Sequence, residues 1–130
     1  MTSLWVPGHP APQGSKRHIG GGRMIESSKA LKPWRSLVAL RARAAGFNLA
    51  PGPVAVSTEF VLRRPASAPK TSHVHAIRRP DVDKLVRAIL DALTGIAYVD
   101  DSQVTHLYAG KRLAVSGEPS GALITVRSLA

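Results

Sequence analysis

One amphipathic stretch constrains the fold more than any other part of the chain. Its apolar residues recur at i, i+3, i+4, i+7 and i+11, the spacing of one helix face: Val82, Leu85, Val86, Ile89 and Leu93. Pro80 keeps the residue before it extended, so the helix begins after Pro80, and Gly95 is a stop signal. Asp83, Arg87 and Asp91 form a second stripe at i, i+4 and i+8, which we expect to face away from the core.

The remaining apolar patterns predict a sheet on which this helix packs. Residues 53–65 alternate apolar and polar side chains with the period of a half-buried strand. A short opening strand is expected over residues 3–7. Two closing strands are expected over residues 102–115 and 121–129, with the segment 116–121 as the turn between them.

A second helix is predicted over residues 32–47, with Pro33 in its first turn and Gly46 as its stop signal. Its apolar face carries Trp34, Leu37, Val38, Ala42 and Ala45. Three arginines of this helix lie off the apolar face: Arg35, Arg41 and Arg43. They could line a path for DNA, although a solvated helix face is the more usual explanation. The element order predicts a small α+β fold, a single domain over residues 1–130 with a mixed β-sheet and helices packed on one face.

The chain is strongly basic, and its charge is unevenly distributed. Eighteen Lys and Arg stand against eight Asp and Glu, which gives a net charge of +10 and a pI near 11.2. Residues 1–80 hold 13 basic and 2 acidic residues, whereas residues 81–130 hold 5 and 6. A field of this sign attracts polyanions, so a nucleic acid is the expected partner. The Pro- and Gly-rich run over residues 7–23 is predicted as a loop, whose basic side chains either meet phosphates or lie on an ordinary surface.

Composition and motifs exclude several classes of protein. With no cysteine, there is no disulfide framework, no cysteine zinc site and no thiol nucleophile. A hydrophobic content of 44% excludes a disordered chain, and no apolar run approaches the roughly 20 residues of a membrane span. The N-terminal residues show no export signal, so we expect a cytoplasmic protein. The GxxxxGKS, HExxH and GxSxG patterns are absent, so NTP hydrolysis, zincin and serine-hydrolase chemistry are unsupported.

Five of the eight acids lie between Asp81 and Asp101. Asp81 suits the N-cap of the predicted helix and Asp83 its first turn, and capping is the simpler explanation of this pair alone. Capping does not explain Asp91, nor the adjacent Asp100 and Asp101 in the connection to the next strand. Like charges this close raise one another's pKa unless a cation neutralises them. The cluster therefore indicates metal-assisted phosphodiester hydrolysis, with Mg²⁺ as the expected ion because it prefers hard oxygen ligands.

The same residues resemble a known family. The run RPDVDKLVRAILDAL, then GIAYVDDSQV and Lys111, together with the opening VPGHPAPQGSKR, is similar to the RusA family of Holliday junction resolvases over most of the chain. The resemblance implies a homodimeric endodeoxyribonuclease that cuts four-way DNA junctions in recombination and repair, with Mg²⁺ or Mn²⁺ as cofactor. It also implies that Asp81, Asp83 and Asp101 bind the metal and act in catalysis. Asp91 and Asp100 are weaker candidates, which would lie near the ion without binding it directly or would stabilise the fold.

Two positions depart from the family pattern. Lys84 stands where the family usually has Asn, and Arg87 stands where it usually has a lysine tied to catalysis. Arginine keeps the charge and can bind phosphate through two N–H groups, but it does not readily shuttle a proton, so Lys84 is a candidate for the missing ammonium. We expect Lys84, Arg87 and Lys111 to face the scissile phosphate. The residues expected to bind DNA are Lys16, Arg17, Arg78, Arg79 and Lys111.

An alternative function stays open at this stage. A basic nucleic-acid-binding protein without catalysis would use the same acids as helix caps and as ion-pair partners of Arg87. Junction cutting, in contrast, needs two active sites related by a two-fold axis, so it predicts an isologous dimer. The apolar strand surfaces of residues 103–115 and 121–129 are the expected contacts, since one layer of helices does not cover them.

The histidines and tryptophans have simpler explanations than chemistry. His73 and His75 could bind a soft metal, but a solvated loop is favoured because no other ligand is close. His106 is expected to be packed or hydrogen-bonded. Trp5 and Trp34 lie among apolar neighbours and fit a core better than base stacking.

Overall fold

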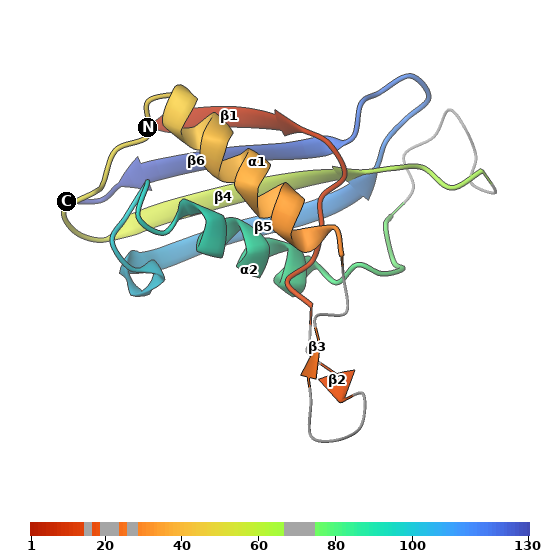
Figure 1. Cartoon of the computed structure of the whole chain (residues 1–130). Coiled ribbons are helices and arrows are strands. Elements are labelled where there is room, and N and C mark those ends of the chain that lie inside the picture. The colour runs from red at the N-terminus through yellow and green to blue at the C-terminus, as the bar shows by residue number, and fades with distance from the viewer. Residues whose placement is uncertain (15–16, 19–23, 26–28, 67–74) are drawn as a thin grey trace.

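A four-stranded mixed sheet carries two helices on one of its faces (Figure 1). The computed structural model describes residues 1–14, 17–18, 24–25, 29–66 and 75–130. Its elements in chain order are β1 (Thr2–Pro7), β2 (Arg17–His18), β3 (Met24–Ile25), α1 (Leu31–Ala44), β4 (Val54–Leu62), α2 (Val82–Leu93), the 3-10 turn η1 (Asp101–Gln103), β5 (Val104–Leu113) and β6 (Gly121–Ser128). The sheet order is β1-β6-β4-β5, in which only the β4–β5 pair is parallel. The predicted α+β class is confirmed.

The apolar stripe of α2 explains where this helix lies. Its buried residues are Leu85, Val86, Ala88, Ile89, Ala92 and Leu93. They belong to one core with Val56 and Phe60 of β4 and with Trp34 of α1. Burying each large apolar side chain stabilises the fold by about 1.5–3 kcal/mol, so the stripe holds α2 against the sheet. Trp34 belongs to the core as predicted, whereas Trp5 is half-buried.

The first helix is shorter than predicted. It ends at Ala44, and Ala45 is exposed beyond it, so the prediction that the helix runs to residue 47 and buries Ala45 is wrong. Gly46 adopts a φ of 84°, and the Phe47 N–H then donates to the Ala42 carbonyl at 3.1 Å. This closure ends the helix and returns the buried Phe47 side chain to the core.

The last two strands are not neighbours, although a turn joins them in sequence. The connection from β4 through α2 places β5 parallel to β4, and β6 pairs with the other side of β4. The run over residues 7–23 is also not wholly a loop, because Arg17 and His18 of β2 pair with Ile25 and Met24 of β3.

One sheet edge and one sheet face stay uncovered by the helices. β5 is an edge strand, and its residues 105–108 are exposed. β6 lies inside the sheet, so it contributes no edge, but Leu123 leaves 44% of its surface exposed on the open face. Among the described residues, neither helix has the length and apolar character that crossing a membrane requires.

Candidate active site

The N-terminal end of α2 presents two exposed carboxylates. Asp81 occupies the N-cap position with an extended backbone (φ −72°, ψ 140°), and its carbonyl accepts the Leu85 N–H at 3.1 Å. Its carboxylate makes no capping hydrogen bond, and Asp83 follows in the first turn. The predicted capping by the Asp81 side chain is therefore not observed, and its carboxylate stays available for another ligand.

Cations surround these carboxylates. The Lys84 Nζ lies 3.9 Å from Asp81 Oδ2, with both side chains substantially exposed. Arg87 is exposed one turn farther along α2, and Arg78 and Arg79 are exposed in the segment that leads into the helix. An exposed ion pair of this length contributes little stability, so Lys84 can leave Asp81 for a phosphate at small cost.

Lys111 holds the segment before α2 in place. Its Nζ donates to the Arg78 carbonyl at 2.8 Å and to the Pro80 carbonyl at 2.7 Å. An ammonium has three donors, so one remains for a phosphate. Sequence reasoning placed Lys111 near the phosphate but missed this positioning role, because the contact joins residues more than 30 positions apart.

At the other end of α2, the double aspartate divides into two roles. The Asp100 carboxylate accepts the Ser102 N–H at 2.8 Å and so caps η1, and this backbone hydrogen bond lowers the pKa of Asp100. The Gln103 Oε1 accepts the Val99 and Asp100 N–H groups in return. Asp100 therefore has a structural role in this turn, although both Asp100 and Asp101 are exposed.

Gln103 also fixes the loop to the rest of the molecule. Its Nε2 donates to the carbonyls of Ala50 and Gly52 at 3.0 and 2.8 Å. The sequence motif included this glutamine, but its structural role was not predicted, although the spacing of Asp100 and Gln103 in DDSQ is a capping-box signature.

Tyr98 shows where Asp101 lies. This fully buried side chain donates its hydroxyl to the Leu90 carbonyl at 2.8 Å, near the C-terminal end of α2. Burial raises the pKa of Tyr98 above its usual range, and the nearby carboxylates of Asp101 and Asp91 raise it further. Both acids therefore lie close to this hydroxyl.

The acids thus form two groups at opposite ends of α2 (Figure 1). Asp81 and Leu90 are separated by about 13 Å along the helix axis. Carboxylate oxygens that share one Mg²⁺ lie within about 4 Å of each other, because each bond is about 2.1 Å long. The structure does not bring Asp101 to Asp81 and Asp83 within one chain. No three His, Cys, Asp or Glu side chains of the described residues are grouped to hold a metal ion.

Comparison with known proteins places the chain in a family. The family model described as "Endodeoxyribonuclease RusA" matches residues 7–127, nearly the whole chain. The chain belongs to the RusA family. RusA enzymes are endodeoxyribonucleases that resolve Holliday junctions, act on branched DNA and depend on a divalent metal ion. A search of curated proteins found no match. The alternative of a binding protein without catalysis is therefore set aside.

The exposed carboxylates suit the divalent ion of RusA enzymes. Asp81, Asp83 and Asp101 offer hard oxygen ligands at the surface, where an ion can keep several waters. Asp100 is the poorer donor, because one of its oxygens already accepts the Ser102 N–H.

The structure describes only some of the remaining residues that the sequence singled out. Lys16 and His73 are not among the described residues, and for Arg17 only the backbone is described. His75 pairs with Arg112 through an isolated backbone bridge. His106 is exposed and forms the predicted hydrogen bond, to Thr105 Oγ1 at 3.0 Å.

Proposed function

We propose that this protein is a Mg²⁺-dependent endonuclease that cuts four-way DNA junctions as a homodimer, in recombination and repair. Membership of the RusA family gives the class of reaction. The observation that carries the site is the Asp81 carboxylate, which stands at an N-cap without capping and lies beside Asp83 and Lys84. Mn²⁺ is the expected substitute for Mg²⁺.

A second copy of the chain can unite the two acid groups. β5 begins just after Asp101 and ends beside the segment that Lys111 holds, so it connects both ends of α2. It is an edge strand with exposed residues around His106. Antiparallel pairing of two β5 strands about a two-fold axis near His106 would place Asp101 against the partner's Lys111. Each site would then combine Asp81 and Asp83 with Asp101 of the partner subunit.

The residues of such a site have separate tasks. Asp81, Asp83 and Asp101 of the partner subunit would hold the ion. When bound, the ion supplies a Lewis acid that activates water and offsets charge on the phosphate. Hydrolysis adds water at phosphorus and breaks one P–O bond, which leaves a phosphate monoester on one strand end and a hydroxyl on the other. Lys84 and Arg87 would stabilise the added negative charge, Arg87 through two N–H groups.

The remaining basic residues would bind the junction arms. Arg78 and Arg79 are exposed beside Asp81, and Lys16, Arg17 and the free donor of Lys111 complete the proposed set. Residues 1–130 would act as one domain. Each copy of this domain in the dimer would contribute half of each of the two sites. Because the substrate is branched DNA, we propose the cytoplasm as the location.

A cleavage assay tests this function. Purified protein is incubated with a synthetic four-way junction or with linear duplexes of the same sequence, in Mg²⁺, Mn²⁺ or EDTA. We expect paired cuts in the junction with either metal, no cuts in EDTA, and little cutting of the duplex. Binding of the junction without cleavage in either metal would contradict the proposal.

A further inference from the structure

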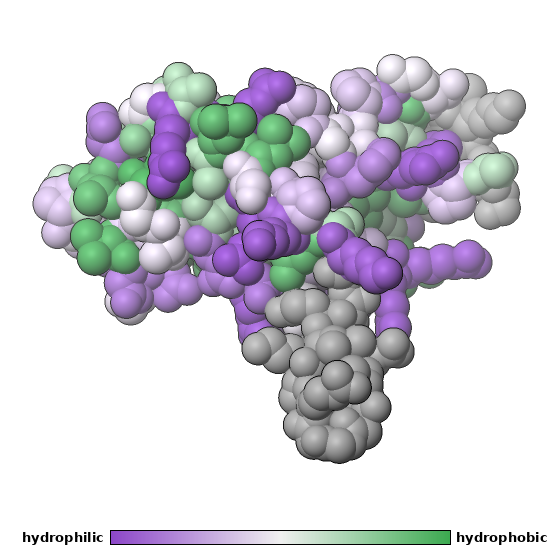
Figure 2. Space-filling model, in the orientation of Figure 1, coloured by the Kyte–Doolittle hydropathy of each residue, from purple (hydrophilic) through white to green (hydrophobic). Residues whose placement is uncertain are grey.

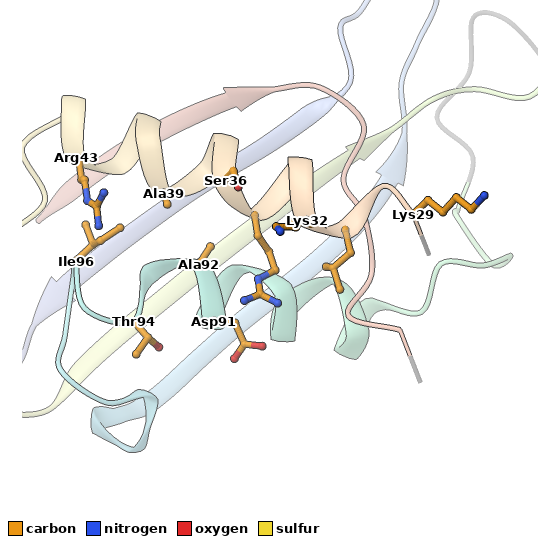
Figure 3. A pocket seen from close by; sticks show the side chains of 11 residues that line it. Lys29, Lys32, Ser36, Ala39, Arg43, Asp91, Ala92, Thr94 and Ile96 are labelled. Atoms are coloured by element: carbon orange, nitrogen blue, oxygen red, sulfur yellow. The ribbon is translucent and has the colours of Figure 1, made fainter. Parts of the chain in front are cut away.

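A groove of about 760 Å³ lies between α1 and the C-terminal half of α2 (Figure 3). Its cations come from the start and one face of α1: Lys29, Lys32, Arg35 and Arg43. Asp91 is the one carboxylate among its lining residues. The groove therefore has a net positive charge at neutral pH. Figure 2 shows hydrophilic side chains gathered on this face, over the region between the two helices.

The groove combines these cations with an apolar lining. Leu31, Ala39, Ala92 and Ile96 also line it, and Ser36 and Ala39 are small enough to let a ligand approach the α1 backbone. Lys32, Ser36, Ala39 and Arg43 follow one another at i, i+4, i+7 and i+11, so they share one helix face (Figure 3). The two charged groups thus stand at the ends of this line, with the small Ser36 and Ala39 between them.

We propose that this groove binds the sugar–phosphate backbone of one DNA strand, outside the proposed carboxylate site. The proposal rests on the proposed function for the identity of its ligand. Phosphates would meet Lys32, Arg35 and Arg43, and deoxyribose rings would pack on the apolar residues between them. Lys32 and Arg43 lie about 16 Å apart along the helix axis, a length that spans several phosphates of one strand.

Two contacts link the groove to the start of α2. The Arg35 Nη1 donates to Gln13 Oε1 at 3.5 Å, and the Gln13 N–H donates to the Lys84 carbonyl at 2.9 Å. The wall of the groove is thereby linked to the turn that carries Asp81 and Asp83. At its other end, the groove reaches Thr94 and Ile96, in the segment that connects α2 to η1 and Asp101. A strand in this groove would run between the two acid groups of the chain.

Exposed arginines of α1 provide a matched test. Arg41 and Arg43 both lie exposed in its last turn, but only Arg43 is among the groove residues. We would measure binding of a fluorescent four-way junction to Arg43→Gln, Lys32→Gln and Arg41→Gln in EDTA over a salt series. Arg43→Gln and Lys32→Gln should each weaken binding roughly five- to tenfold at about 0.1 M salt, and should reduce the slope of log K against log salt by about 0.9. Arg41→Gln should change neither.

The possible outcomes test the DNA-binding groove and the proposed nuclease function independently. Equal weakening by all three variants would indicate a general charge effect and would overturn the groove, as would unchanged binding by Arg43→Gln and Lys32→Gln. Thermal melting checks that the variants fold, which we expect because all three side chains are exposed. Since binding is measured in EDTA, failure of the wild type to cleave DNA would contradict the proposed function without affecting this result.

Discussion

At the scale of single residues, the adjacent Asp100 and Asp101 offer the sharpest contrast. Asp100 caps η1, and Asn caps a helix as well as Asp, so Asp100→Asn should keep the loop and leave cleavage within about threefold of wild type. Asp101→Asn removes a proposed metal ligand and should lower cleavage by at least roughly a hundredfold. Single-turnover cleavage of a four-way junction checks both. Similar losses in the two variants would mean that the loop, and not the carboxylate, matters.

Asp81 and Asp83 allow the same test at the other end of α2. Asp→Asn at either position preserves shape and removes one ligand charge. Cleavage should fall by at least roughly a hundredfold, while junction binding persists or tightens because repulsion of phosphate is relieved. The Asp81 carboxylate makes no capping bond, so thermal stability should hardly change. Retained cleavage by Asp83→Asn would remove it from the site.

Lys84 and Arg87 can be ranked by three substitutions. If Arg87 acts through its charge, Arg87→Lys should keep substantial cleavage activity and Arg87→Ala should not. If Lys84 supplies the ammonium, Lys84→Ala should be the more damaging alanine variant. Cleavage rates at saturating protein distinguish these cases. Normal rates in both alanine variants would mean that neither side chain serves the phosphate.

At the scale of elements, Lys111 should matter to the N-terminal end of α2. Lys111→Met leaves the Arg78 and Pro80 carbonyls without their charged donor, which should destabilise the protein by about 1–3 kcal/mol and lower cleavage. Lys84→Met is the matched control, since its one ion pair is long and exposed and contributes at most about 1 kcal/mol. Denaturant unfolding compares the two. A Lys111→Met variant as stable as wild type would argue against the positioning role.

The helices and strands were predictable where the repeat of apolar residues continued without interruption over several turns. The α2 stripe repeats over three turns, and the structure buries it as predicted, apart from the half-buried Val82. The end of α1 was predicted less closely. Gly46 turns the chain as the predicted stop signal, but the last helical residue is Ala44, because Ala44 and Ala45 continue the apolar pattern up to the glycine.

The candidate site was predicted as a set of residues but not as a geometry. The number of acids in a short segment indicated a carboxylate cluster, and the resemblance to the RusA family selected Asp81, Asp83 and Asp101 from it. Their placement at opposite ends of α2 follows from the rise of the helix and from the course of β5, which depends on strand order. Lys111 shows the same limit, because parallel pairing of β4 and β5 determines which loop its ammonium reaches.

At the scale of the whole molecule, each proposed active site takes carboxylates from two copies of the chain. Asp83→Asn and Asp101→Asn proteins, carrying different tags, can be coexpressed and the mixed dimer isolated. In a shared arrangement the mixed dimer has one intact site, with Asp81 and Asp83 from one copy and Asp101 from the other, and a second site with both lesions.

Nicking of a four-way junction by the mixed dimer is therefore the most direct measurement. Each homodimer should be nearly inactive, and the mixed dimer should nick a single strand at a rate approaching that of one wild-type site. If each chain instead built its own complete site, both sites of the mixed dimer would carry a lesion. A mixed dimer as inactive as the two homodimers would contradict the shared site.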